Sequence, residues 1–342
     1  MSETAFAKIL KQVASGAVLS AEESAAAFSA IMQGDVSPPR MAAFLTALAM
    51  RKPAVTEILG AVRAMRASMR TIRPPRNAID VCGTGGDGMS TLNVSTAVAF
   101  VVAACGIPVA KHGNRNMSSQ TGAADVLEAL GFRIELDSAA AEDCLAETGF
   151  CFLFAPHYHP AMKHVAPVRR ELGFRTIFNL IGPLSNPAGV RRQLMGVFSR
   201  EWLAPVAAVL RELDAEAAWV VHSADGMDEI SIAANTYVVK LHGGRLADDE
   251  ITPEQARLPS TGVSAIRGGS AEENATAIRD LLAGRPSAFR DIVLLNAAAA
   301  LIVATATDTL QNGAERAAEA IDSGAARDVL ERAAVFTKHA AP

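Results

Sequence analysis

Residues 80–96 read DVCGTGGDGMSTLNVST, and their pattern is the clearest indication of the chain's architecture. A short apolar segment runs into a cluster of glycines, and an apolar segment rich in Ala and Val follows. Glycine allows positive φ angles and a close approach to a ligand, and the amides of such a turn, with those of a following helix N-terminus, form a phosphate cradle. We therefore predict a strand over 78–81, a ligand-binding turn, and a helix over 93–104.

The polar residues of this stretch favour a phosphate site over a simple tight turn. A Gly-rich turn alone often serves only to reverse the chain. Here Asp87, Asn93, Ser95 and Thr96 add carboxylate, amide and hydroxyl groups. Such groups bind phosphate oxygens or a metal ion beside a helix start, so we interpret the stretch as a phosphate-binding loop.

Outward from this loop, short apolar segments alternate with Ala-rich helical segments. Further strands are predicted at 107–110, 132–136, 151–154, 193–198 and 218–222. The helices between them are predicted at 121–130, 139–148 and 204–213. Such a series forms a mainly parallel sheet with helices on both faces. Residues 237–241, followed by two glycines, predict a late β-hairpin, and the last stretch, 271–330, is predicted to be helical.

The chain before the first strand carries helical patterns only, and a Pro-rich linker separates it from the sheet. The predicted fold class is therefore α/β, in which a mainly parallel sheet domain flanked by helices is joined to a smaller all-helical domain. A helical, Pro-bounded interruption of the strand series is predicted to join the helical domain. The expected helical domain is 1–72 with the insertion 160–187, and the expected α/β domain is 77–159 and 188–342.

Composition excludes several classes of protein. The net charge of -4 and pI near 6.0 exclude a broadly basic nucleic-acid surface. The 4 cysteines show no C-x-x-C pair, which favours buried thiols in a reducing compartment. The first residues resemble no signal peptide, and the longest apolar stretches are too short or too polar to span a bilayer. We expect a cytoplasmic protein that binds neither nucleic acid nor membrane.

Two other polar loops are predicted at the same edge of the sheet. Residues 111–122 read KHGNRNMSSQTG and residues 222–230 read HSADGMDEI, and each follows a predicted strand. Because the carboxyl ends of parallel strands form one crevice, both loops should meet the Gly-rich turn there. Lys111 offers positive charge to phosphate, and the adjacent acids Asp228 and Glu229 suit Mg²⁺. The acidic pair alone is typical of a solvated surface, but beside two phosphate-type loops it predicts a magnesium site.

The predicted helical interruption begins with polar side chains whose roles are less specific. His157 and His159 form a His-x-His pair, but without another His or Cys cluster we favour a role other than metal binding. Arg169 can clamp a carboxylate through its planar guanidinium. On residue type alone, a surface salt bridge is the alternative for Arg169.

Several of these segments together resemble the anthranilate phosphoribosyltransferase family. In chain order they are GTGGD at 83–87, KHGNR at 111–115, RTIFNLIGPLSNP at 175–187, Asp-Glu at 228–229 and Leu-Asn at 295–296. The resemblance covers nearly the whole chain. It implies a fold of the nucleoside phosphorylase and phosphoribosyltransferase type, with the site between the two domains. It also implies a homodimer formed through the helical domain, and Phe44, Leu45 and Leu48 are predicted to be exposed there for the second subunit.

The resemblance implies a reaction of tryptophan biosynthesis. The enzyme would transfer the 5-phosphoribosyl group from phosphoribosyl pyrophosphate to the amine of anthranilate. Pyrophosphate would be released, and N-(5-phosphoribosyl)anthranilate would form. Two Mg²⁺ ions are expected to bind together with the donor.

The resemblance also implies site residues. The donor is expected at Gly83, Gly86, Asp87, Thr91, Asn93, Val94, Ser95, Thr96, Lys111, Asn114, Ser118, Ser119 and Ala123. Anthranilate is expected at Gly83, His112, Asn114, His159, Arg169 and Pro183, and magnesium at Ser95, Asp228 and Glu229. The chain departs from the commonest family pattern at Asn116, Met117, Gln120 and Ala123. Ala123 stands where the family often has serine, so that donor contact loses its hydroxyl.

Two alternative functions fit less well. A pyrimidine nucleoside phosphorylase shares the fold type, but its phosphate loop typically reads Lys-His-Ser-Thr-Gly-Gly, unlike residues 83–87. A non-enzymatic nucleic-acid-binding relative would favour a basic surface and tolerate loss of the acidic pair. The negative net charge and the presence of Asp228 and Glu229 argue against it.

Overall fold

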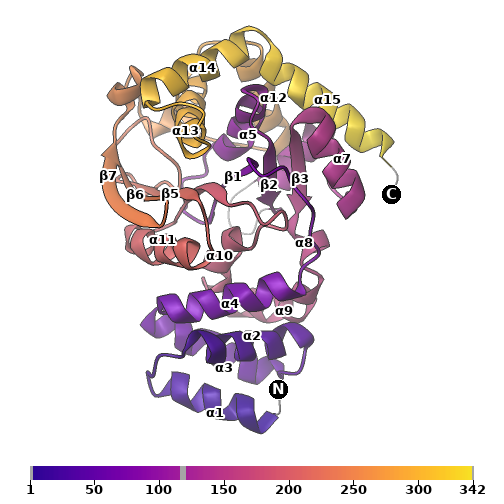
Figure 1. Ribbon diagram of the computed structural model, residues 1–342, viewed down its shortest axis with the longest axis vertical. Helices are drawn as coiled ribbons and strands as arrows, with labels where there is room; N and C mark the ends of the chain where they lie inside the picture. The colour runs from indigo at the N-terminus through magenta and orange to yellow at the C-terminus, as the bar shows by residue number, and fades with distance from the viewer. Residues whose placement is uncertain (1–2, 116–120, 341–342) are drawn as a thin grey trace.

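The computed structural model describes residues 3–115 and 121–340 and shows a helical part below an α/β part (Figure 1). The helical part begins with α1 (Glu3–Ala14), α2 (Ala21–Gln33), α3 (Pro38–Arg51) and α4 (Val55–Ser68). Ser20 begins α2 with a capping box. Its Oγ accepts from the Glu23 N–H at 3.1 Å, and the Glu23 carboxylate accepts from the Ser20 N–H at 3.0 Å.

The segment between the third and fourth strands packs against these helices. It contains α8 (Ala155–Tyr158), the 3-10 helix η1 (Pro160–His164), α9 (Ala166–Leu172), α10 (Phe178–Ile181) and the 3-10 helix η2 (Pro183–Ser185). α9 lies against α3, and η1 lies against α2. The Phe178 ring meets the Phe28 ring edge-on, with centroids 5.7 Å apart. The exact domain boundaries stay a prediction.

The helical core is filled by side chains of this one chain. Phe44, Leu45 and Leu48 are fully buried, and the Phe44 ring lies 5.5 Å from Phe6 and 5.6 Å from Phe28 between centroids. The prediction that these three α3 side chains are exposed for a second subunit is therefore wrong. An apolar helix face predicts burial but does not tell which neighbour provides it, and here α1 and α2 do.

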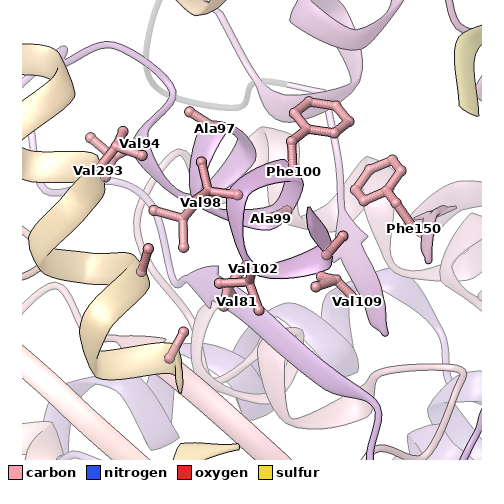
Figure 2. Close-up of a cluster of buried hydrophobic side chains, with 14 of the residues drawn as sticks. Val81, Val94, Ala97, Val98, Ala99, Phe100, Val102, Val109, Phe150 and Val293 are labelled. Atoms are coloured by element: carbon pink, nitrogen blue, oxygen red, sulfur yellow. The ribbon is translucent and has the colours of Figure 1, made fainter. Parts of the chain in front are cut away.

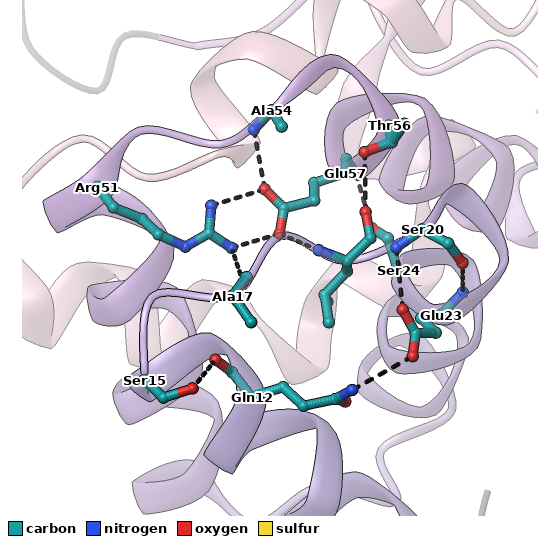
Figure 3. Close-up of polar contacts among 11 residues, drawn as sticks. Gln12, Ser15, Ala17, Ser20, Glu23, Ser24, Arg51, Ala54, Thr56 and Glu57 are labelled. Carbon is teal, nitrogen blue, oxygen red and sulfur yellow. Dashed lines mark hydrogen bonds and ion pairs between the residues drawn. The ribbon is translucent and has the colours of Figure 1, made fainter.

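A buried carboxylate ties α3 to α4 (Figure 3). The Glu57 side chain is fully buried and pairs with the Arg51 guanidinium through both of its oxygens. It also accepts from the backbone N–H groups of Leu19 at 3.0 Å and Ala54 at 2.8 Å. Because a buried charge is costly unless it is paired and hydrogen-bonded, this network holds the ends of three helices together.

The α/β part is built on one seven-stranded sheet, in the order β3-β2-β1-β4-β5-β6-β7. The strands are β1 (Ile79–Gly83), β2 (Val109–Gly113), β3 (Phe150–Phe154), β4 (Arg192–Gly196), β5 (Ala217–Ser223), β6 (Thr236–His242) and β7 (Arg245–Ile251). The first five pair in parallel, whereas β6 and β7 form an antiparallel hairpin beside β5. The predicted α/β class, the mainly parallel sheet and the late hairpin are confirmed.

Helices cover both faces of the sheet. They are α5 (Val94–Ala104), α6 (Ala123–Ala129), α7 (Ser138–Thr148), α11 (Leu203–Glu212), α12 (Ala271–Leu282), α13 (Ala288–Val303), α14 (Leu310–Asp322) and α15 (Ala325–His339), with short 3-10 turns at Arg200–Trp202, Pro253–Ala256 and Val263–Ile266. α5 is buried almost all round because its residues are nearly all apolar. Figure 2 shows its Phe100 beside Phe150 of β3, and the ring centroids are 4.7 Å apart. On the other face, α11 packs against α4.

Residues 132–136 do not form the strand that their pattern predicts. Their side chains do alternate between buried and more exposed, as a half-buried strand would. Their backbone groups, however, form hydrogen bonds with side chains of other elements. The Arg133 N–H donates to Thr337 Oγ1 of α15 at 3.1 Å, and the Tyr158 hydroxyl donates to the Leu136 carbonyl at 3.1 Å. Alternation reports one-sided burial, and β3 already occupies the sheet edge next to β2.

Two smaller predictions are also settled by the structure. All 4 cysteines are buried free thiols. Across residues 3–115 and 121–340, no helix combines the length and apolar character needed to span a membrane.

Candidate active site

A cavity of about 600 Å³ lies where the helical part faces the carboxyl ends of the parallel strands. Its walls come from the loops after β1, β2 and β5, from the end of α4, and from the segment after β3. These elements are far apart in the sequence, and the chain's topology brings them to one sheet edge (Figure 1). A cavity at the carboxyl ends of parallel strands is the usual ligand position in this architecture.

The Gly-rich loop after β1 needs its glycines for two reasons. Gly85 and Gly86 have φ angles of 66° and 74°, which suit residues without a Cβ. At Gly83 the reason is space, because an added Cβ would lie 2.3 Å from the Asp228 Oδ2. The Gly85 N–H donates to that same carboxylate oxygen at 2.7 Å. The glycines thus allow the loop to lie directly against the acidic segment after β5.

The acidic segment holds carboxyl groups that burial makes reluctant to ionise. Burial, together with the nearby Asp87, raises the pKa of Asp228 to about 7. Burial, together with Asp228 itself, raises the pKa of Glu229 to about 8. Clustered carboxylates whose charge is only partly offset, here by Lys111 near Glu229, are the condition that a bound cation relieves. Among the described residues, no group of three or more His, Cys, Asp or Glu side chains could hold a metal ion.

Lys111 lies beneath this region as a buried cation. Its Nζ donates to the Val81 carbonyl at 2.7 Å and to the Ser95 Oγ at 3.1 Å. Burial lowers the pKa of Lys111, and the nearby Asp80 and Glu229 partly offset this. The contacts fix the ammonium group beside the start of α5, where the Gly-rich loop ends.

His112 and His159 form a neutral pair on the opposite wall. Their Nε2 atoms lie 3.2 Å apart. Burial lowers the pKa of His112 well below its ordinary value and that of His159 to about 4. The backbone N–H of His112 donates to the Asp80 Oδ1 at 3.2 Å, and the other oxygen of Asp80 accepts from Asn186 Nδ2 at 2.8 Å. The pair therefore presents uncharged imidazoles to the cavity.

Arg169 of α9 is a largely desolvated cation at the helical end of the cavity. Burial lowers the pKa of its guanidinium. Its Nη2 lies 3.5 Å from the Asn179 Oδ1, and its guanidinium carbon lies 5.5 Å from the centroid of the Phe178 ring. In the described part of the chain no carboxylate pairs with it, so the surface salt bridge considered as its alternative role is not formed. The guanidinium is available to an anionic group in the cavity.

Comparison with known proteins places the chain in a family. The pattern of the glycosyl transferase family matches twice, its helical bundle domain over residues 7–69 and its a/b domain over residues 75–327. An anthranilate phosphoribosyltransferase of Rhodopseudomonas palustris (strain BisB18) is 53% identical over 336 residues, which is 98% of this chain and 99% of the relative. The chain belongs to the anthranilate phosphoribosyltransferase family. The resemblance inferred from the motifs is confirmed.

Solved structures of family members have the same fold. The crystal structure of anthranilate phosphoribosyltransferase from Thermus thermophilus superposes with a TM-score of 0.92 at 44% identity, covering 96% of this chain and 99% of that one. The Saccharomyces cerevisiae enzyme in complex with PRPP and Mg gives a TM-score of 0.91 at 27% identity, covering 99% of both chains. The fold of the anthranilate phosphoribosyltransferases therefore extends over the whole chain.

The structure gathers nearly all the family site residues predicted from the sequence. The described residues among them line the one cavity, with a single exception. Thr96 is absent from the lining because it lies one position deeper in α5, where its side chain is buried. Ser118 and Ser119, with the divergent Asn116, Met117 and Gln120, lie outside the described residues. The binding roles of all these residues stay predictions.

Other lining and supporting residues were not assigned a role from the sequence. Arg175 donates to the Gly86 carbonyl and lies 4.6 Å from the centroid of the Phe198 ring, and Asn179 accepts from Arg169. Both Arg175 and Asn179 are polar residues of the stretch at 175–187, and that position was the available signal. Met65 of α4 also lines the cavity, but in sequence it is indistinguishable from a core residue.

Proposed function

We propose that this chain transfers the 5-phosphoribosyl group from phosphoribosyl pyrophosphate to the amine of anthranilate, releasing pyrophosphate, in the synthesis of tryptophan. One observation carries the proposal. A single cavity joins a Gly-rich phosphate loop, a buried lysine and an acidic pair to a desolvated arginine. The loop, the lysine and the acidic pair suit a diphosphate with its metal, and the arginine suits an aromatic carboxylate. Yeast relatives solved with PRPP and Mg, and with 4-fluoroanthranilate, support both halves.

The donor is held, in this proposal, by the two loops predicted from the sequence. Backbone N–H groups of the Gly-rich loop and the ammonium of Lys111 face the phosphate oxygens. Asn93, Ser95 and Ala123 line the same part of the cavity. Because these donors are already fixed by the fold, little reorganisation opposes binding of the charged leaving group.

Magnesium belongs at Asp228 and Glu229, with Ser95, as two ions bound with the donor. When bound, Mg²⁺ supplies positive charge that stabilises the departing pyrophosphate. The raised pKa values of Asp228 and Glu229 support this assignment, because they mark negative charge that the protein alone does not compensate. Donor oxygens would supply further ligands, so that metal and donor should each raise the other's affinity by the same factor.

The acceptor lies toward Arg169, whose guanidinium pairs with the anthranilate carboxylate. The amine nitrogen forms a bond to ribose C1 as the C1–O bond to pyrophosphate breaks, and the nitrogen then loses one proton. An aromatic amine is neutral near pH 7, so it attacks without prior deprotonation. The uncharged His112 and His159 place no competing positive charge beside it. Catalysis then depends chiefly on positioning and electrostatics.

We also infer a homodimer formed through the helical domain, taken as residues 1–72 with 160–187. Met50 is 83% exposed and Val18 is 59% exposed, and an Arg51 bond to the Ala17 carbonyl at 3.0 Å keeps their two segments together. Exposed large apolar side chains favour association. Light scattering should give the mass of two chains for the wild type and of one for Met50→Glu. A dimer whose interface lies wholly on the α/β part would contradict this. A cytoplasmic location stays our prediction.

The experiment that tests the function follows the loss of anthranilate fluorescence with and without phosphoribosyl pyrophosphate and Mg²⁺. The wild type should consume anthranilate only when both are present. Replacing Asp228 by Asn together with Glu229 by Gln should lower the rate by at least about 100-fold, the scale of one lost electrostatic contact to a transition state. The matched control, Asp248→Asn with Asp249→Asn on the exposed strand β7, makes the same acid-to-amide change away from the cavity and should keep the activity. Activity without Mg²⁺ or donor would refute the proposal.

A further inference from the structure

The two donor loops are linked by a closed ring of hydrogen bonds that runs through the C-terminal half of the chain. Asn274 Nδ2 of α12 donates to Asn93 Oδ1 at 2.9 Å, and Asn93 Nδ2 donates to the Thr121 carbonyl at 3.4 Å. Thr121 Oγ1 donates to the Gly269 carbonyl at 2.8 Å, and the Gly269 N–H returns to Asn274 Oδ1 at 2.8 Å. Asn93 ends the first loop and Thr121 belongs to the second, so the ring joins both.

The two amide orientations in this ring agree with the backbone groups at its ends, the Gly269 N–H and the Thr121 carbonyl. The Gly269 N–H can only donate, so it requires an oxygen on Asn274. The other terminal atom of Asn274 is then an NH₂ group, which requires the oxygen of Asn93 to face it. Asn93 is thereby obliged to turn its own NH₂ group toward Thr121 and the cavity. The backbone of residue 269 thus determines which atoms Asn93 presents.

The ring also draws Asn93 away from the role its position favours. Asn93 is the N-cap residue of α5, where asparagine normally accepts from the first N–H groups of its own helix. It makes no such capping bond here, and its oxygen instead accepts from Asn274. Its side chain therefore does not occupy the N-terminus of α5, which opens into the cavity beside Lys111.

Residues 266–268, just before Gly269, form hydrogen bonds with the backbone of the first loop. The Leu92 N–H donates to the Ile266 carbonyl at 2.9 Å, and the Gly268 N–H donates to the Ser90 carbonyl at 2.8 Å. A Cβ at Gly268 would lie 2.5 Å from the Thr91 oxygen, so the close approach requires glycine. Asn274 itself is only 2% exposed. The segment and the donor loop are therefore joined by backbone hydrogen bonds and close packing.

We propose that Asn274 is a positioning residue for the phosphoribosyl donor, acting through Asn93. It holds Asn93 off the helix cap, sets its amide orientation, and fixes the distance between the two donor loops. Asn274 does not line the cavity, so it does not touch the donor itself. This role rests on the proposed function, because it assumes that the two loops bind a diphosphate sugar.

The test measures the Kd of phosphoribosyl pyrophosphate by calorimetry with Mg²⁺ present, for wild type, Asn274→Ala, Asn93→Ala and the double variant. Each single change should weaken donor binding by about 10-fold, the effect of one neutral hydrogen bond. The double variant should bind the donor no more weakly than the single variant with the larger loss, because both changes open the same ring. The anthranilate KM at saturating donor should stay unchanged, which separates positioning of the donor from general damage to the site.

Asn274→Asp tests amide orientation at nearly constant side-chain shape; because its added negative charge also opposes an anionic donor, the decisive result is retained donor affinity. Aspartate keeps the shape and still accepts from Gly269, but it faces Asn93 with an oxygen and forces that amide to turn round. The inference predicts that this variant binds the donor at least as weakly as Asn274→Ala. Should Asn274→Ala fail to fold, Asn93→Ala and Asn274→Asp still test the ring.

Two controls complete the design. Thr276→Ala changes an exposed position on α12, and Ser24→Ala removes a buried hydrogen bond in the helical part. Both should bind the donor like the wild type. Wild-type donor affinity in Asn274→Asp, or additive losses in the double variant, would overturn the inference while leaving the proposed function intact. A wild-type chain that binds no donor would overturn both.

Discussion

Acidification to pH 5 should remove the stability that the neutral pair of His112 and His159 contributes to this protein. Their Nε2 atoms lie 3.2 Å apart, so one ring must donate while the other accepts, and the two rings cannot both be protonated. Protonating both rings would set two N–H groups against each other. Burial already lowers the pKa of His159 to about 4, and that of His112 well below its ordinary value.

The magnitude follows from proton binding to the folded and unfolded states. The ordinary pKa of histidine is 6.5, so at pH 5 the unfolded chain protonates His159 whereas the folded chain scarcely does. The contribution of His159 to the free energy of unfolding is therefore fully present above pH 6.5 and is lost as the pH falls toward 4. The loss for His159 is about 2 kcal/mol at pH 5 and approaches roughly 3 kcal/mol near pH 4. His112 adds a loss of the same sign.

Urea unfolding of wild type and His159→Gln, each at pH 7.5 and pH 5, measures this effect. Glutamine stays neutral and can donate or accept. The buried carboxyls of Asp80, Asp228 and Glu229 have raised pKa values of about 6, 7 and 8, and they gain stability as the pH falls. The comparison therefore uses the difference between the two proteins. The wild type should lose about 2 kcal/mol more than the variant, and the exposed-site control His242→Gln should follow the wild type. Equal changes in unfolding free energy between the two pH values in wild type and His159→Gln would show that protonation of His159 does not affect stability.

Three substitutions test other parts of the structure. Arg169→Ala should raise the anthranilate KM by about 10–100-fold with little change in the donor KM, since a charged hydrogen bond contributes about 1.5–3 kcal/mol; steady-state kinetics that show the reverse would reassign this residue. Glu57→Ala should lower the free energy of urea unfolding by about 3–5 kcal/mol, because it leaves the partly buried Arg51 without its partner; a loss near zero would show that the pair contributes nothing. Asn296→Ala removes bonds of 3.0 Å and 2.8 Å to the N–H and carbonyl of Ile230, and calorimetry should show a weaker Mg²⁺ dependence of donor binding; an unchanged dependence would mean that these bonds do not hold the acidic pair.

The sheet and its loops were predictable because their signals are local. A glycine cluster after an apolar run indicates a strand end wherever it occurs, and polar loops at 111–122 and 222–230 followed the same rule. Strand pairing is not local. Residues 132–136 have the alternation of a strand, but their partner is α15, which lies about two hundred residues later in the chain. Similarly, the apolar face of α3 predicted burial correctly and its partner wrongly.

The cavity lining was also largely predictable, because chemistry placed at strand ends converges in a parallel sheet. The residues that orient this lining were not. Asn274 lies in a helix whose pattern gives an ordinary amphipathic surface, and Asn296 lies in the apolar run LLNAAAAL. Asparagine is a weak helix former that often bonds with nearby backbone instead. A buried asparagine within such a helix is therefore the signal to look for, although the sequence does not tell which loop it holds.

Both asparagines reach the site from helices that come late in the chain, and this has a consequence for how the site forms. Asn274 on α12 holds Asn93 and the Gly269 backbone, while Asn296 on α13 holds Ile230 directly after the acidic pair. In Figure 1, α12 and α13 lie on the side of the sheet where α5 is packed, away from the helical part. The loops that face the substrates are therefore fixed from behind by elements that touch no substrate. Since the acidic loop and the donor loops depend on different helices, Asn296→Ala should act on the Mg²⁺ dependence of donor binding and Asn274→Ala on donor affinity without Mg²⁺, and only loss of the common packing around α5 should impair both.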